Sequence, residues 1–172
     1  MVEFVDELDG RCGVAVKLDR RGIGDAGVAS DTPINCRVRG TSLRVALKQS
    51  LTEIGLHYFL KDGAVVISSK DVAESEDNLS IRVYSIGDID ANNYTGLINC
   101  ITETVSKNSW DENGGPGKIE PATGSKCLII AQTDEVHAKI LDLLRALRTA
   151  HKLWPRDARR GEMGSAVGQG MM

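Results

Sequence analysis

The sequence predicts an α+β protein built from two small α/β sandwich domains. Three observations point to this class: short segments in which apolar and polar residues alternate, segments in which apolar residues recur every three or four positions, and one acid-rich stretch that separates two groups of them. The expected element orders are αββαββ at 1–70 and βαββα at 80–152. We expect a linker at 71–79 and a disordered tail at 153–172.

The first domain starts with a helical pattern over residues 2–12, where apolar side chains share one face and Gly13 can end the helix. Strands are expected at 14–19 and 33–40, because hydrophobic and polar residues alternate there. The remaining elements are a helix capped by Thr41 or Ser42 and a hairpin that turns at Lys61, Asp62 and Gly63.

A glycine motif lies between the first two expected strands. Gly22-x-Gly24-x-x-Gly27 has the spacing of a dinucleotide-binding fingerprint, which needs a following helix to hold the phosphate. Here Pro33 and an alternating strand pattern follow instead, and no acid for a ribose lies about 20 residues further on. We therefore predict a flexible loop and no bound cofactor.

The second domain shows a different order of patterns. From Pro155 onward the sequence has no period and much glycine, which favours a disordered tail. In order, the expected elements are a strand at 81–86, a helix capped by Asn92 or Asn93, strands at 118–120 and 126–132, and a helix that begins after Thr133.

The segment between the first helix and second strand of this domain is the most unusual part of the chain. It contains one of the two tryptophans, two acids and a glycine-proline turn. We predict that it is a structural lid, in which the tryptophan folds back over the core and the glycines reverse the chain. The functional alternative is a candidate partner-binding loop that consists of Trp110, Asp111, Glu112, Gly114, Gly115, Pro116 and Gly117.

Residues that could carry catalysis or bind a metal form no known constellation. The three histidines lack metal-ligand spacing, and no G-x-S-x-G elbow marks a nucleophile. Asp134, Glu135 and His137 open one expected helix, where acids complement the helix dipole. We therefore expect no metal, no cofactor and no enzymatic activity.

The four cysteines are expected to be small buried hydrophobes, because each lies at an apolar position of its segment and none forms a C-x-x-C pair. A Cys12–Cys36 bridge or a Cys100–Cys127 bridge stays open as an alternative in an oxidising compartment.

The charge of the chain argues against nucleic acid. The formal net charge is −3, which gives no overall attraction to phosphate or acidic membranes. The βαββα order and the Gly114-x-x-Gly117 spacing invite comparison with a KH domain, whose glycine clamp grips a nucleic-acid backbone. That clamp joins two helices, and residues 78–150 hold seven Lys/Arg against nine Asp/Glu. A KH-like nucleic-acid-binding module is the alternative function.

The first domain resembles the short N-terminal domain shared by secretins and TonB-dependent transducers. The second is similar to the small ring-building N domains of secretins, with SKCLIIAQTDEVHAKILDLLRALR as their closing strand and helix, although the loop at 109–121 departs from secretin usage. In the first domain the match rests on Gly13 to Asp19, Pro33, Gly40 to Leu43, Ala46, Leu47, Leu51, Gly55, Leu56, Tyr58, Asp62, Gly63 and Ile67.

The resemblance implies binding and not catalysis. In transducers the short domain contacts an inner-membrane signalling partner, and in secretins it builds periplasmic rings. We therefore expect a protein–protein interaction or assembly module, periplasmic or otherwise associated with the bacterial cell envelope, whose partner is another protein or a second copy. The opening MVEFVDELDGRCG is no signal peptide, and no apolar run approaches the roughly 20 residues that span a bilayer. Met1 leads directly into a helical pattern, so we expect a fragment of a longer protein.

Overall fold

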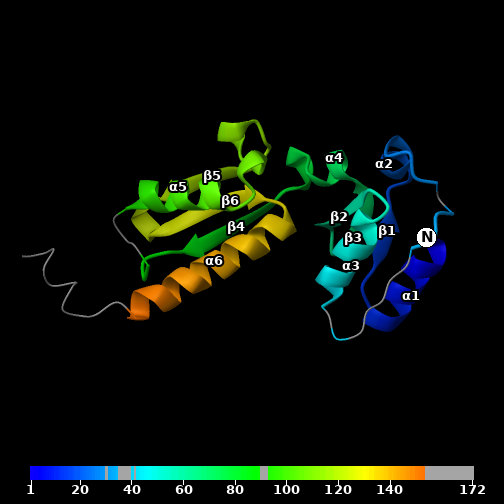
Figure 1. Ribbon diagram of the computed structural model, residues 1–172, viewed down its shortest axis with the longest axis horizontal. Coiled ribbons are helices and arrows are strands. Elements are labelled where there is room, and N and C mark those ends of the chain that lie inside the picture. The colour runs from blue at the N-terminus through cyan, green and yellow to red at the C-terminus, as the bar shows by residue number, and fades with distance from the viewer. Residues whose placement is uncertain (30, 35–39, 41, 90–92, 154–172) are drawn as a thin grey trace, which may run out of the picture.

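A computed structural model describes residues 1–29, 31–34, 40, 42–89 and 93–153. It contains two three-stranded sheets with helices packed on them, so the protein is α+β as the sequence predicts. The two sheets lie one after the other along the long axis of the molecule (Figure 1). Most of the strand predicted at 33–40, and the predicted tail beyond Leu153, lie outside the described residues.

The first sheet has the strand order β1-β3-β2. Strand β1 (Val16–Leu18) runs parallel to β3 (Ala64–Ser69), and β2 (Leu56–Lys61) runs antiparallel to it. Asp62 and Gly63, between β2 and β3, have φ values of 52° and 75°. Two consecutive positive φ values are typical of a tight hairpin turn, so the predicted hairpin is confirmed.

Helices α1 (Val2–Cys12) and α3 (Leu43–Thr52) supply much of the first core. Ser42 caps α3, because its hydroxyl oxygen accepts a hydrogen bond from the Val45 amide at 3.4 Å. The fully or nearly fully buried apolar residues of this core are Met1, Phe4, Leu8, Ile23, Leu47, Leu51, Leu56, Val65 and Ile67.

The glycine motif was predicted to be a flexible loop, but its first two glycines, Gly22 and Gly24, lie in helix α2 (Arg20–Asp25). Asp19 caps this helix by accepting a hydrogen bond from the Gly22 amide at 3.2 Å, and Ser68 on β3 donates to its other oxygen at 2.7 Å. The Ser68 and Gly22 hydrogen bonds lower the pKa of Asp19. A Cβ at Gly22 would collide with the Ser68 hydroxyl, so this glycine lets the helix lie close against the strand, where Ile23 is buried.

The predicted linker at 71–79 carries short elements of its own, α4 (Lys70–Ala73) and the 3₁₀ turn η1 (Glu76–Asn78). Ser69 caps α4 by accepting a hydrogen bond from the Val72 amide at 3.3 Å. Lys61 on β2 donates to the Asn78 side chain at 2.9 Å, which ties the end of this segment to the first sheet.

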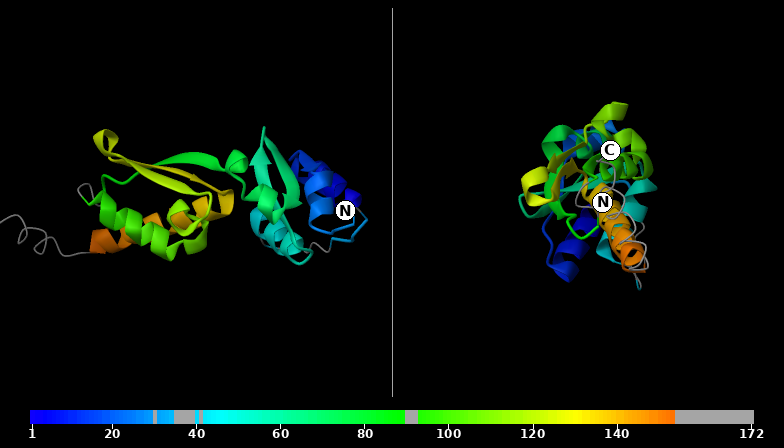
Figure 2. Two further views of the ribbon diagram at one scale, coloured as in Figure 1. Left: turned by 90° about the horizontal axis from the view of Figure 1, so that it is seen from above. Right: turned by 90° about the vertical axis from the view of Figure 1, so that its left-hand side faces the viewer.

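The second sheet is antiparallel throughout and has the order β4-β6-β5. Asn93 and Thr133 cap its two helices, by accepting hydrogen bonds from the amides of residues 96 and 136. Both helices lie on one face of the sheet, and no described element covers the other face (Figure 2). The elements are β4 (Ser80–Ser85), α5 (Tyr94–Thr104), η2 (Lys107–Ser109), η3 (Asp111–Asn113), β5 (Lys118–Ala122), η4 (Thr123–Ser125), β6 (Cys127–Gln132) and α6 (Asp134–Leu153).

The second core fills the space between this sheet and its helices. It is separate from the first core, because each draws all of its buried residues from its own half of the chain. The buried residues are Ile86, Leu97, Ile101, Val105, Trp110, Leu128, Ile130, Val136, Ile140 and Leu144.

Two of the cysteines correct the prediction of buried thiols. Cys100 and Cys127 are free and partly exposed. Leu128 and Ile130 of β6 point into the core, so the alternation of the strand places Cys127 on the opposite face, where its thiol donates to the Ser125 carbonyl at 3.1 Å. The side chains of Cys12 and Cys36 lie outside the described residues.

Candidate functional site

Trp110, the first residue of the candidate loop, is completely buried in the second core. Its indole nitrogen Nε1 donates to the Val105 carbonyl at 2.7 Å. Val105 is the C-cap of α5, and the last carbonyls of a helix have no partner within the helix. The side chain therefore fills the core and satisfies a helix end, as the lid interpretation expects.

The glycines of the loop serve two different needs. Gly114 has φ 82°, a left-handed conformation that glycine adopts without strain. Gly117 has no positive φ, but a Cβ there would collide with the Gln132 amide and lie 2.6 Å from the Ser109 carbonyl oxygen. A Cβ at Gly115 would collide with the Ser109 backbone. Close packing therefore explains two of the glycines, and positive φ explains the third.

The backbone amides of the loop bond to the loop itself. The Gly117 amide donates to the Ser109 carbonyl at 2.8 Å, and the Asp111 amide donates to the Gly117 carbonyl at 2.9 Å. The Gly115 amide donates to the Trp110 carbonyl at 2.9 Å. These amides are already occupied, so they do not form a cradle that points outward at a phosphate. The exposed part of the loop carries Asp111 and Glu112, which would repel one.

Gln132, at the end of β6, holds the loop in place and was missed by the sequence analysis. Its buried side chain donates to both the carbonyl and the hydroxyl of Ser109, at 3.0 and 2.8 Å, and accepts from the Thr133 amide at 3.0 Å. The signal available in the sequence is a polar residue at a core-facing position of an apolar strand, which requires internal hydrogen bonds.

His137 belongs to a closed hydrogen-bond network between β4 and α6. The ring is fully buried, with Nε2 2.7 Å from the Ser80 carbonyl oxygen and Nδ1 2.9 Å from the Tyr84 hydroxyl. The carbonyl can only accept, so Nε2 carries the proton and Nδ1 accepts from the tyrosine. Burial lowers the pKa of His137, which keeps the ring neutral.

The acids of the same helix turn are also engaged. Asp134 forms an ion pair with Arg82 and accepts a weaker hydrogen bond from the Ser80 hydroxyl at 3.4 Å. Ser80 meets His137 only through its backbone carbonyl, so serine, histidine and aspartate do not form a nucleophilic triad here. Among the residues described, no group of three or more His, Cys, Asp or Glu is placed to hold a metal ion.

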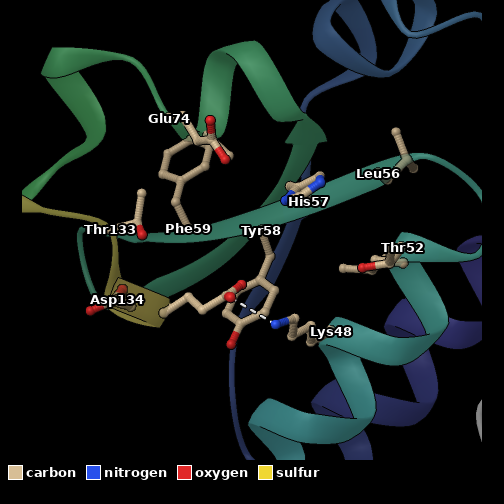
Figure 3. A pocket seen from close by; sticks show the side chains of 12 residues that line it. Lys48, Thr52, Leu56, His57, Tyr58, Phe59, Glu74, Thr133 and Asp134 are labelled. Carbon is tan, nitrogen blue, oxygen red and sulfur yellow. Dashed lines mark hydrogen bonds and ion pairs between the residues drawn. The ribbon is translucent and has the colours of Figure 1, made fainter. Parts of the chain in front are cut away.

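The two halves of the molecule meet through polar contacts around a cleft. Lys48 on α3 lies 2.7 Å from Glu135 of α6, and Lys139 lies 2.9 Å from the same carboxylate. Burial opposes ionisation of Glu135, but hydrogen bonds from both lysines lower its pKa. Figure 3 shows the Lys48 ion pair beside Tyr58, near Asp134.

The cleft extends to the candidate loop as a cavity of about 290 Å³, to which Ser109 and Pro116 contribute. Its other lysine, Lys70, lies 4.0 Å from Glu74. Each lysine of the cavity therefore has a carboxylate within 4.0 Å, although Lys48 and Lys139 share that of Glu135.

One face of the second sheet is not covered by any described element, and we call it the open sheet face. Ile81 and Val83 of β4 and Ile129 of β6 are 72%, 64% and 41% exposed. Val83 and Ile129 are direct cross-strand partners, and Ile81 pairs with Ala131, so the apolar side chains are contiguous. Lys118 and Glu120 of β5 form a charged rim on the next strand.

Comparison with known proteins finds similarity to solved structures of secretins. No protein-family model matches the sequence, and no curated protein matches it. The chain is similar to the N-terminal domain of the secretin XcpQ from Pseudomonas aeruginosa, with a TM-score of 0.32 and 19% identity over 86% of this chain and 60% of that one. It is similar to the Type IV competence pilus secretin PilQ of V. cholerae, with a TM-score of 0.33 and 15% identity over 85% of this chain and 35% of that one. The chain thus spans less than two thirds of either structure.

Proposed function

We propose that this chain is a non-enzymatic protein–protein interaction or assembly module of a bacterial cell-envelope protein. The open sheet face is the observation that carries the proposal. Three large aliphatic side chains stand in solvent on one flat surface, next to a charged rim, and such contiguous apolar surfaces mark protein contacts. The face is formed by paired strands whose other side lines the second core, and not by a loop.

The envelope location rests on the sequence resemblance to secretin and transducer N-terminal domains. Within the part of the chain that the structure describes, no helix is both long and apolar enough to cross a membrane. The partner is another protein or a further copy of the chain, and we infer a periplasmic or envelope-associated setting for that contact.

A nucleic-acid role receives less support from the geometry. The loop compared with a KH clamp joins α5 to β5, its amides bond internally, and its exposed side chains are acidic. A phosphate backbone would meet repulsion there. A gel shift at low salt with single-stranded DNA and RNA should show no complex.

Site-specific photo-crosslinking in the native host tests the proposal. A photoreactive residue at Val83 or Ile129 of the full gene product should give a discrete adduct with a protein. The matched control is Arg145, an exposed position on α6, which should give none. Equal crosslinking from all three positions, or none from the sheet positions, would overturn the assignment of the open sheet face.

A further inference from the structure

We infer that the free edge of β4 is a strand-addition site, which takes an extended segment of a partner protein with apolar side chains on alternate positions and an acidic side chain between them. This inference rests on the proposed function and makes it more specific, because it names the edge of the sheet, and not only its face, as the recognition element.

One hydrogen bond and the strand register show which residues of β4 bond to β6 and which face the free edge. The Ile86 amide donates to the Lys126 carbonyl at 3.0 Å, immediately beyond the Ser85–Cys127 pair. In an antiparallel ladder the bonded residues alternate, so the even-numbered residues of β4 bond to β6. The N–H and C=O groups of Ile81 and Val83 therefore point away from β6, toward the free edge.

This edge is open among the described residues, since β6 is the only strand that pairs with β4. The Ser85 carbonyl, at one end, accepts a hydrogen bond from Arg148 Nη2 at 2.6 Å. Ile81 and Val83 lie before that point, and their side chains are the two most exposed on the open sheet face. A row of unpaired ladder groups flanked by apolar side chains is the usual template for an added strand.

The opposite edge of the sheet, at β5, is protected. By the same alternation, Ile119 and Pro121 direct their backbone groups to the free edge of β5, because Lys118 and Glu120 pair with Ala131 and Ile129 of the central strand. Proline has no N–H to offer there, and proline and lysine are devices that prevent edge pairing. Strand addition is therefore directed to β4.

The charges beside β4 select the occupant. Between Ile81 and Val83, Arg82 points to the helix side, 38% exposed, with Asp134 on its Nη2. A guanidinium carries five N–H donors, so Arg82 can bind a second carboxylate, whereas a lysine would have to compete with Arg82 for the carboxylate of Asp134. A second copy fits poorly: the antiparallel register that sets Ile81 opposite Val83 of the copy also sets Arg82 opposite itself, and like charges directly opposite destabilise a sheet.

The probe is a set of short, blocked, fluorescent peptides whose centre is Ile-Xaa-Val, with Xaa as glutamate, glutamine or lysine, and binding to the full chain is measured by fluorescence anisotropy. The glutamate peptide should bind about tenfold tighter than the lysine peptide. Two versions of it, each N-methylated on one alternate set of amides, should differ, because only one set faces β4. No binding by any peptide, or equal binding by both methylated versions, would overturn the inference.

Two protein variants complete the test. Val83→Pro removes an outward N–H and Val83→Ala keeps it, so Val83→Pro should weaken binding by about a further tenfold. Melting curves establish that both variants are folded. If both variants lost the same peptide affinity, the peptide would contact only the Val83 side chain, and strand addition would be overturned. A dimer of the free chain that Val83→Pro abolishes would make a second copy the occupant, which also overturns it. Crosslinking at Ile129, in the central strand, tests the open sheet face without involving the β4 edge. The proposed function and the strand-addition site can therefore be refuted separately.

Discussion

Trp110 donates its indole N–H to the Val105 carbonyl at 2.7 Å, and this contact joins the candidate loop to the end of α5. Val105 is followed by Ser106 in a left-handed conformation, φ 48°, so the helix stops abruptly there. Five residues of chain then return the indole to the core that the helix has just left. The loop is thus part of the fold of the second half.

Replacing Trp110 with alanine should lower the free energy of unfolding by about 3–5 kcal/mol, because it empties a fully buried aromatic site. It also leaves the Val105 carbonyl without its partner. Urea denaturation measures the loss. In a Trp154→Phe background, the emission of Trp110 should be blue-shifted and poorly quenched by acrylamide. Quenching close to that of free tryptophan would contradict the burial and favour a partner-binding loop.

Gly117→Ala should destabilise the protein although Gly117 has no positive φ. The new Cβ would lie 2.6 Å from the Ser109 carbonyl oxygen and would displace the buried Gln132 amide. Overpacking of this kind costs about 1–3 kcal/mol. Gly124→Ala is the matched control, since nothing lies within 4 Å of a Cβ there, and its melting temperature should stay close to wild type. Equal melting temperatures for the two variants would refute the packing argument.

Residue patterns predict most of the elements because helix caps and the hairpin turn are local. Ser42, Asn93 and Thr133 cap the helices, and Asp62-Gly63 forms the turn, all within a few residues of the elements concerned. Helix α2 was not predicted, although its cap is also local, since Asp19 accepts from the Gly22 amide. Two of its six residues are glycine, which disfavours a helix, and the Ser68 hydrogen bond that holds Asp19 comes from a distant strand and exists only in the folded chain.

The open sheet face was missed for a related reason. Alternation in β4 shows that Ile81 and Val83 share a face, but it does not tell which face is inward. The polar set, which includes Arg82 and Tyr84, turns toward α6 because Asp134 and His137 receive it. The aliphatic set is left in water. Partners on a helix that lies about 50 residues away decide the orientation.

The stability of the protein should fall as pH drops below about 6.5, the ordinary histidine pKa. Burial lowers the pKa of His137 in the folded state, so below pH 6.5 the unfolded chain binds a proton that the folded chain does not. Protonation then favours unfolding, down to the lowered pKa. Urea midpoints between about pH 7 and 5 measure the slope. His137→Gln should flatten it in this window, and an unchanged slope in that variant would assign the dependence to another group.

Fragments 1–79 and 80–153 should each fold alone, because each core takes all of its buried residues from one half of the chain. The contacts between the halves are exposed ion pairs, such as Lys48–Glu135 at 2.7 Å and Lys118–Glu76 at 3.1 Å. Exposed pairs contribute only about 0–1 kcal/mol each, too little to hold separate fragments together. Each fragment should therefore show its own cooperative melting transition, and a mixture should elute as two species.

Limited proteolysis of the intact chain tests the same boundary without truncation. The first cut should fall between residues 70 and 80, because this segment adds no residue to either core cluster, or beyond Leu153, where the sequence is rich in glycine and lacks apolar periodicity. Higher salt should speed the cut at 70–80, since salt screens the Lys118–Glu76 pair, which holds this segment, and the Lys48–Glu135 pair between the two halves. A first cut within 43–69 or 127–147, or a fragment 80–153 that is unfolded by circular dichroism, would show that the two halves form one cooperative unit.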